Sequence, residues 1–167
     1  MAEATVRRVR AGDAARVRAI RLEMLADSPL AFLERIDEAA ARSHTEVQAR
    51  TAERAVSAEV AAFIAELDGR VVGHAGGWVP PGSAGMTVVF AVYVTPAARG
   101  TGVVGRLVEA VAQWSRESGR PTLGLEVIVG NHRAIRAYER LGFTDTGQRA
   151  PHPNLPVLTE QLMTRPA

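Results

Sequence analysis

The sequence contains no cysteine, no lysine and few aromatic residues. Without cysteine, disulfide bonds and thiolate metal sites are excluded. The four histidines have neither H-x-x-H nor H-E-x-x-H spacing, so we expect no catalytic metal. All 20 basic residues are arginines, scattered among 18 acidic residues to give a formal net charge of +2. This pattern lacks the concentrated basic stripe of a nucleic-acid-binding surface, and we expect no nucleic-acid partner.

Long apolar runs are also missing. No 18-residue apolar segment is present to form a membrane span, and the N-terminus lacks the apolar stretch of a signal peptide. We therefore expect a cytoplasmic protein without a membrane partner. Its 167 residues are 47% hydrophobic and 23% charged, which is typical of a globular chain. This length favours a single domain over residues 1–167.

Residue periodicity predicts strands alternating with helices. The expected strands are Thr5–Val9, Val60–Leu67, Val71–Trp78, Met86–Val94, Leu123–Val129, one starting at Gly142-Phe143, and Pro156–Met163. The expected helices are Asp13–Ala26, a region from Leu30 to Arg54 interrupted near Ser43-His44, Thr101–Ser118 and Asn131–Leu141. The order β-α-α-β-β-β-α-β-α-β-β predicts a mixed α/β sheet, in which the middle β-α-β is the parallel crossover.

Residues Gly100–Gly105 fit the dinucleotide fingerprint G-x-G-x-x-G. Its context argues against that interpretation, because five residues separate the strand from Gly100 and no further βαβ units follow to build a dinucleotide-binding sheet. A Walker-type loop would need a lysine. The glycines either form a plain connection or bring the backbone close to an anion at the helix N-terminus, and their conformational cost favours the anion.

Two motifs in the segment Phe90–Phe143 resemble the cofactor half of the GNAT superfamily of acetyl-CoA-dependent N-acetyltransferases. The first is V-x-P-x-x-R-G-x-G at Val94–Gly102. The second is L-E-V-x-x-x-N-x-x-A-x-x-x-Y-x-x-x-G-F, from Leu125 to Phe143. The resemblance implies a GNAT-like acyltransferase fold with splayed central strands, and acetyl-CoA as cosubstrate. The N-terminal third, which shapes the acceptor pocket in this family, matches only in element order.

The resemblance also implies a set of cofactor-binding residues. They are Val92, Tyr93, Val94, Arg99, Gly100, Thr101, Gly102, Val103, Val104, Gly105, Asn131, Ala134 and Tyr138. The amides of Val92 and Val94 would pair with the extended pantetheine arm as a neighbouring strand does, and the Val92 N–H would polarise the thioester carbonyl. Val104 departs from the family pattern, which usually has glycine or alanine at this position.

Glu126 and Tyr138 are the expected catalytic residues. Glu126 stands in an apolar strand, where burial would favour its protonated form and make it a better base. Alternatively, it is a strand-end carboxylate paired with an arginine. Tyr138 is placed by the resemblance near the CoA sulfur as general acid, although its helical spacing also suits a core residue. Asn131 has a second interpretation as a helix N-cap.

The acceptor is not specified by the sequence beyond a primary amine, either a small molecule or a protein N-terminus. Five acids in the N-terminal helices either attract a cationic amine or form ordinary exposed helix faces: Glu23, Asp27, Glu34, Asp37 and Glu38. His74, Trp78 and His152 are candidate lining residues. We expect direct attack of the amine, since no cysteine is available for a thiol intermediate. A non-catalytic acyl-CoA sensor is the alternative, and the resemblance allows a homodimer.

Overall fold

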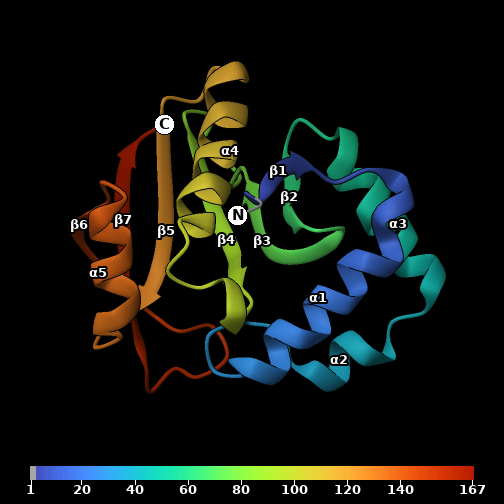
Figure 1. Ribbon diagram of the computed structural model, residues 1–167. Coiled ribbons are helices and arrows are strands. Elements are labelled where there is room, and N and C mark those ends of the chain that lie inside the picture. The colour runs from blue at the N-terminus through green and yellow to red at the C-terminus, as the bar shows by residue number, and fades with distance from the viewer. Residues whose placement is uncertain (1–2) are drawn as a thin grey trace.

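A mixed seven-stranded sheet forms the centre of the computed structural model, which describes residues 3–167 (Figure 1). The strand order is β1-β2-β3-β4-β5-β7-β6. The strands are β1 (Thr5–Arg8), β2 (Val60–Leu67), β3 (Arg70–Trp78), β4 (Met86–Val94), β5 (Thr122–Ile128), β6 (Thr144–Pro151) and β7 (Thr159–Pro166). All neighbouring pairs are antiparallel except β4 and β5. A doubly wound dinucleotide-binding sheet is mostly parallel, so this topology rules out the dinucleotide interpretation of Gly100–Gly105.

Five α-helices and two short 3-10 helices connect these strands within residues 3–167. The α-helices are α1 (Ala14–Asp27), α2 (Ile36–Ala41), α3 (His44–Val56), α4 (Val103–Glu117) and α5 (His132–Arg140). The 3-10 helices are η1 (Ala11–Asp13) and η2 (Pro96–Ala98). The predicted α/β class and mixed sheet are confirmed. The predicted helical region from Leu30 to Arg54 begins only at Ile36. Its predicted interruption near Ser43-His44 is confirmed, because Ser43 is extended and begins α3 as its N-cap.

The two faces of the sheet carry different helices. On β2, Ala61, Phe63 and Ala65 pack in the cluster that contains Leu107 and Val111 of α4. The alternate residues Ala62 and Ile64 pack with Val9 and with Val17 of α1. This alternation is expected of a strand buried on both faces. In Figure 1, α1, α2 and α3 lie together beside β1–β3, whereas α5 lies beside β6 and β7.

Helix α4 packs close to strand β3 because β3 has glycines at the contact. A Cβ atom at Gly73 would lie 2.9 Å from the Leu107 side chain, and one at Gly77 would lie 2.8 Å from Val111. Any larger residue would push the helix away from the sheet. The glycines therefore fix how near the N-terminal half of α4 lies to the central strands.

Strands β4 and β5 pair only at one end and then diverge. Their register runs from Met86 opposite Thr122 to Val88 opposite Gly124, and their C-terminal ends lie apart in Figure 1. A bulge in β4 accompanies the divergence: Ala91 has φ of +50° and the register with β3 shifts there. The predicted splay of the central strands is therefore confirmed. It opens the sheet where the second half of β4 has no partner on its β5 side.

Candidate active site

The loop between β4 and α4 has a backbone that requires glycine. Gly100 and Gly102 have φ of +77° and +82°, in the left-handed region that other residues rarely adopt. No heavy atom lies within 4 Å of a Cβ built at either position, so the loop faces open space. The Thr101 hydroxyl donates to the Ala98 carbonyl at 2.6 Å and holds the loop in place. A plain connection between a strand and a helix would not need two such residues.

The N-terminus of α4 presents backbone N–H groups to that space. Gly102 is the N-cap and has no side chain to satisfy them. The first backbone hydrogen bond of the helix runs from the Arg106 N–H to the Gly102 carbonyl at 3.2 Å. The amides of Val103, Val104 and Gly105 therefore precede the intrahelical bonding pattern, at the positive end of the helix dipole. This arrangement suits a pyrophosphate.

Arg99 and Tyr93 connect the cofactor strand to α1. The Arg99 Nε donates to the Val94 carbonyl at 3.1 Å, and its Nη2 pairs with Asp27 at the end of α1. Its guanidinium lies 5.8 Å from the centre of the Tyr93 ring. The Tyr93 side chain is buried against α1 and donates its hydroxyl proton to Glu23 at 3.2 Å. Both side chains thus contact α1.

The residues expected to bind the pantetheine arm border the splay. The side chains of Val92 and Val94 pack against the α4 cluster, whereas Ala91 and Tyr93 pack against α1. The valine side chains therefore belong to the core. Their strand lacks a β5 partner beyond Val88, so its backbone borders the gap that an extended ligand could fill.

Glu126 is exposed, which contradicts the expectation that it is buried in an apolar strand. Strand alternation is the reason: Leu125 and Val127 point into the α4 cluster, so Glu126 points to the opposite face. Within residues 3–167 its carboxylate has neither a hydrogen bond nor an ion pair, so the alternative of an arginine partner is not supported. Glu126 lies directly opposite Leu162 of β7.

Glu160 is a second carboxylate near Glu126, and sequence reasoning gave it no role. It lies diagonally across from Glu126 on β7 and is half-buried. Burial, followed by the nearby charge of Glu126, raises the pKa of Glu160. The Nε2 atom of His152, which is buried, lies 3.9 Å from the Glu160 carboxylate. An acidic residue inside the predicted strand Pro156–Met163 was the available signal, but the register that brings it to Glu126 cannot be read from sequence.

Tyr138 lies on the other face of the sheet from Glu126. It is half-buried, packs against the α4 cluster and makes an edge-to-face contact with Phe143 at 5.9 Å. Burial raises the pKa of Tyr138 to about 12, so the phenol keeps the proton that a general acid must donate. Asn131 accepts the Ala134 N–H at 3.3 Å, which confirms the predicted N-cap of α5.

The five N-terminal acids do not form a free acidic surface. Four of them contact cations or hydroxyls: Glu23 binds Tyr93, Asp27 binds Arg99, Glu34 binds Arg21, and Asp37 binds Arg35. The fifth, Glu38, accepts the Arg35 N–H at the start of α2. Of the histidines and tryptophan considered as lining residues, His74 is buried on β3 and its Nδ1 lies 2.9 Å from the Ala91 carbonyl. Trp78 is 39% exposed.

Among residues 3–167, no group of three or more histidine, aspartate or glutamate side chains is arranged to hold a metal ion. None of the helices in this range combines the length and apolar character needed to span a membrane.

Comparison with known proteins agrees with the site geometry. Residues 25–143 match the acetyltransferase (GNAT) family, and the chain belongs to that family. Mycothiol acetyltransferase from Thermomonospora curvata is 40% identical over 83 residues, which are 49% of this chain and 27% of that protein. The chain spans well under half the length of the curated relatives that it matches.

Solved structures share the whole fold. An acetyltransferase of the GNAT family from Streptococcus pneumoniae has a TM-score of 0.81 and 20% identity, covering 98% of this chain and 99% of that one. The yncA protein from Salmonella typhimurium, solved with its cofactor acetyl-CoA, has a TM-score of 0.78 and 20% identity, covering 98% and 94%. At this identity the likeness establishes the fold.

Proposed function

We propose that the protein transfers an acetyl group from acetyl-CoA to a primary amine. The observation that carries this proposal is the combination of the β4–β5 splay with a glycine loop at the N-terminus of α4. An extended arm fits the open strand edge, and a pyrophosphate fits the free amides beside it. Family membership and the acetyl-CoA in the yncA structure support the same ligand.

In this proposal, the binding residues divide by the part of the ligand they hold. The amides of the loop and first helical turn, from Arg99 to Gly105, bind the pyrophosphate. Val92, Tyr93 and Val94 offer backbone groups to the pantetheine arm. Asn131, Ala134 and Tyr138 contact the arm from α5. Acetyl-CoA supplies an activated thioester. The acceptor supplies the attacking amine, and the protein supplies the groups that transfer protons and stabilise charge.

The proposed chemistry needs one base, one oxyanion donor and one acid. Glu126 takes a proton from the acceptor ammonium, directly or through water, which frees the nitrogen lone pair to attack the acetyl carbon. The Val92 N–H donates to the carbonyl oxygen as negative charge develops there. Tyr138 gives its proton to the departing CoA thiolate. The C–N bond forms as the C–S bond breaks, and no enzyme side chain is acylated.

A non-catalytic acyl-CoA sensor is the alternative, and two observations favour it. Val104 replaces the small residue usual in the loop, and Glu126 is exposed. The two functions differ in turnover. With acetyl-CoA and a panel of small amines and N-terminal peptides, an acetyltransferase releases free CoA thiol, and the acetylated amine gains the mass of one acetyl group. Acetyl-CoA binding without thiol release for any amine would support the sensor.

A further inference from the structure

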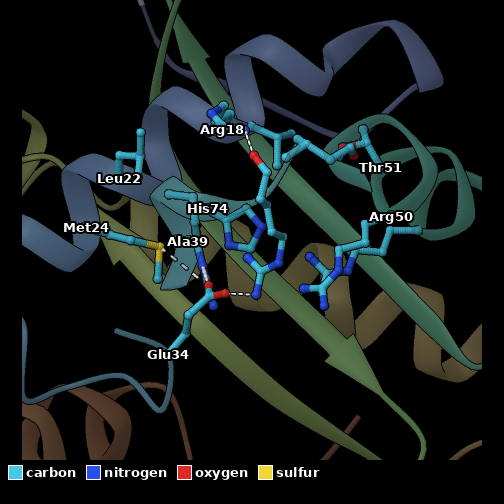
Figure 2. Close-up of a pocket in the computed structure, with 13 residues that line it drawn as sticks. Arg18, Leu22, Met24, Glu34, Ala39, Arg50, Thr51 and His74 are labelled. Atoms are coloured by element: carbon cyan, nitrogen blue, oxygen red, sulfur yellow. Dashed lines mark hydrogen bonds and ion pairs between the residues drawn. The ribbon is translucent and has the colours of Figure 1, made fainter. Parts of the chain in front are cut away.

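A cavity of about 50 Å³ lies between α1, the α2–α3 region and β3 (Figure 2). This volume is enough for a few water molecules or one small polar group. Arginines dominate its charged lining, together with a single acid. The charged residues are Arg18, Arg21, Arg42, Arg50, Arg54 and Glu34. The cavity is therefore strongly positive, the opposite of the acidic acceptor surface considered from sequence.

Three of these arginines have partners within the protein. Arg18 donates to the carbonyls of Arg42 at 2.7 Å and Ala40 at 2.9 Å, and so ties α1 to the end of α2. Arg21 pairs with Glu34 at 2.6 Å, and Arg42 pairs with the same carboxylate. Figure 2 shows Glu34 directed at its arginine partners across the cavity. One carboxylate therefore serves two guanidinium groups.

Arg50 and Arg54 have no such partner. They stand one turn apart on α3, and within residues 3–167 neither guanidinium bonds to a carboxylate or a carbonyl. Arg54 lies 5.7 Å from the centre of the Phe90 ring. Burial, and then the charges of Arg21 and Arg50, lower the pKa of Arg54 to about 10. Like charges at this helical spacing destabilise the protein, and a bound anion would relieve that cost.

The cavity adjoins the strand on which the acetyl group would be held. His74 lines it, and the imidazole Nδ1 lies 2.9 Å from the carbonyl of Ala91, the bulge residue next to Val92. Phe90, under the Arg54 guanidinium, precedes the bulge on the same strand. A short acceptor could therefore place one end among the arginines and its amine at the β4–β5 splay.

We propose that this cavity binds an oxyanionic group of the acceptor, so that the acceptor is a small amine that also carries a carboxylate or phosphonate. Arg50 and Arg54 are the residues that bind the anion, because their guanidinium forks match oxyanions and have no internal partner. This assignment rests on the proposed acetyl transfer and adds the class of acceptor to it.

Anion binding is tested first without turnover. The protein is saturated with CoA, so that the loop before α4 is filled, and titrated with inorganic phosphate at constant ionic strength while its melting temperature is followed. We expect stabilisation of the wild type and of Arg70→Gln, which removes an exposed arginine outside the cavity. The Arg50→Gln/Arg54→Gln variant should lose it. If the double variant does not fold, the single variant Arg50→Gln, at an exposed position, replaces it in the titration. Equal stabilisation of all variants would overturn the proposal.

Turnover then tests the class of acceptor. Small amino acids are compared with their carboxamides, and aminoalkylphosphonates are included to distinguish the two oxyanions. The carboxylated or phosphonated amines should have KM values at least ~10-fold lower than neutral analogues, the scale of hydrogen bonds to a charged group. The double variant should abolish that preference without changing the KM for acetyl-CoA.

The phosphate titration and the turnover assay together distinguish failure of the anion site from failure of the proposed acetyl transfer. Acetylation that favours carboxamides or peptides, without arginine-dependent phosphate binding, contradicts the anion site and leaves acetyl transfer intact. Arginine-dependent phosphate binding without thiol release from any amine supports the anion site but contradicts acetyl transfer to such acceptors.

Discussion

Two carboxylates on neighbouring strands, Glu126 and Glu160, define the base side of the proposed reaction. Glu126 is on β5, which borders the splay, whereas Glu160 is one strand further away on β7. Glu160 is the more buried of the two, and its pKa is raised. Position therefore favours Glu126 as the base, and the shifted pKa favours Glu160. We assign the base by position, because a base must first reach the proton it removes.

Substitution of each carboxylate distinguishes them. We expect Glu126→Gln to lower kcat/KM by roughly 10²-fold or more, the usual size for loss of a general base. Glu160→Gln is the matched control, since it makes the same chemical change on the adjacent strand, and it should have a much smaller effect. Steady-state rates are measured where chemistry limits turnover. If Glu126→Gln has a nearly normal kcat/KM and Glu160→Gln a strongly reduced one, Glu160 is the general base.

Single residues were predictable where the relevant partner is close in sequence. Asn131 as an N-cap needs only its own helix, and it was identified correctly. The exposure of Glu126 was missed because its apolar neighbours in sequence point to the other face of β5. Strand alternation alone leaves open whether a given face is covered, and the helices α1–α3 do not bury this residue.

At the scale of elements, the start of α4 is the feature on which the proposed cofactor binding depends. Its first amides face open space beyond Gly100 and Gly102. Val104 contributes both an amide and an unusual branched side chain. If the amide holds the pyrophosphate, the side chain matters little, and the departure from the family pattern has no consequence for binding.

Two substitutions of Val104 distinguish the contribution of its backbone amide to CoA affinity from that of its side chain. Val104→Ala keeps the N–H and should bind CoA about as well as the wild type. Val104→Pro removes the N–H at a first-turn position that tolerates proline, and we expect it to lose about 1.5–3 kcal/mol of CoA affinity. Calorimetric titration measures both, with circular dichroism to confirm the helix. A folded proline variant with unchanged affinity would show that this amide does not hold the ligand.

The elements themselves were largely readable from the sequence. The strands Val60–Leu67, Val71–Trp78 and Met86–Val94 were predicted within a residue of their observed bounds, because turn residues such as Asp68-Gly69 separate them. The break between α2 and α3 was predicted correctly near Ser43-His44, whereas the helix expected from Leu30 begins only at Ile36. Ser43 and Glu46 form a capping box, a serine followed three residues later by glutamate, and this signal marks the start of α3.

On the scale of the whole molecule, the sheet separates the proposed cofactor side from the proposed acceptor side. The proposed cofactor residues lie within one contiguous stretch, from Val92 to Tyr138, so motif and spacing were enough to propose them. The arginine cavity is assembled from α1, α2, α3 and β3, and its members were dispersed among many other arginines in the sequence. Only packing brings them together, and therefore only the structure could reveal this positively charged cavity.

Acetyl-CoA is the proposed ligand of the splay and the glycine loop, and every role proposed for a residue depends on that ligand. The direct test is the melting temperature of the protein with acetyl-CoA, NADH or ATP at equal concentrations. A ligand that binds only the folded state at 100 times its Kd should raise the melting temperature by roughly 5–10 °C for a chain of this size. We predict that shift for acetyl-CoA and little change for the other two. A larger shift with NADH than with acetyl-CoA would contradict the account.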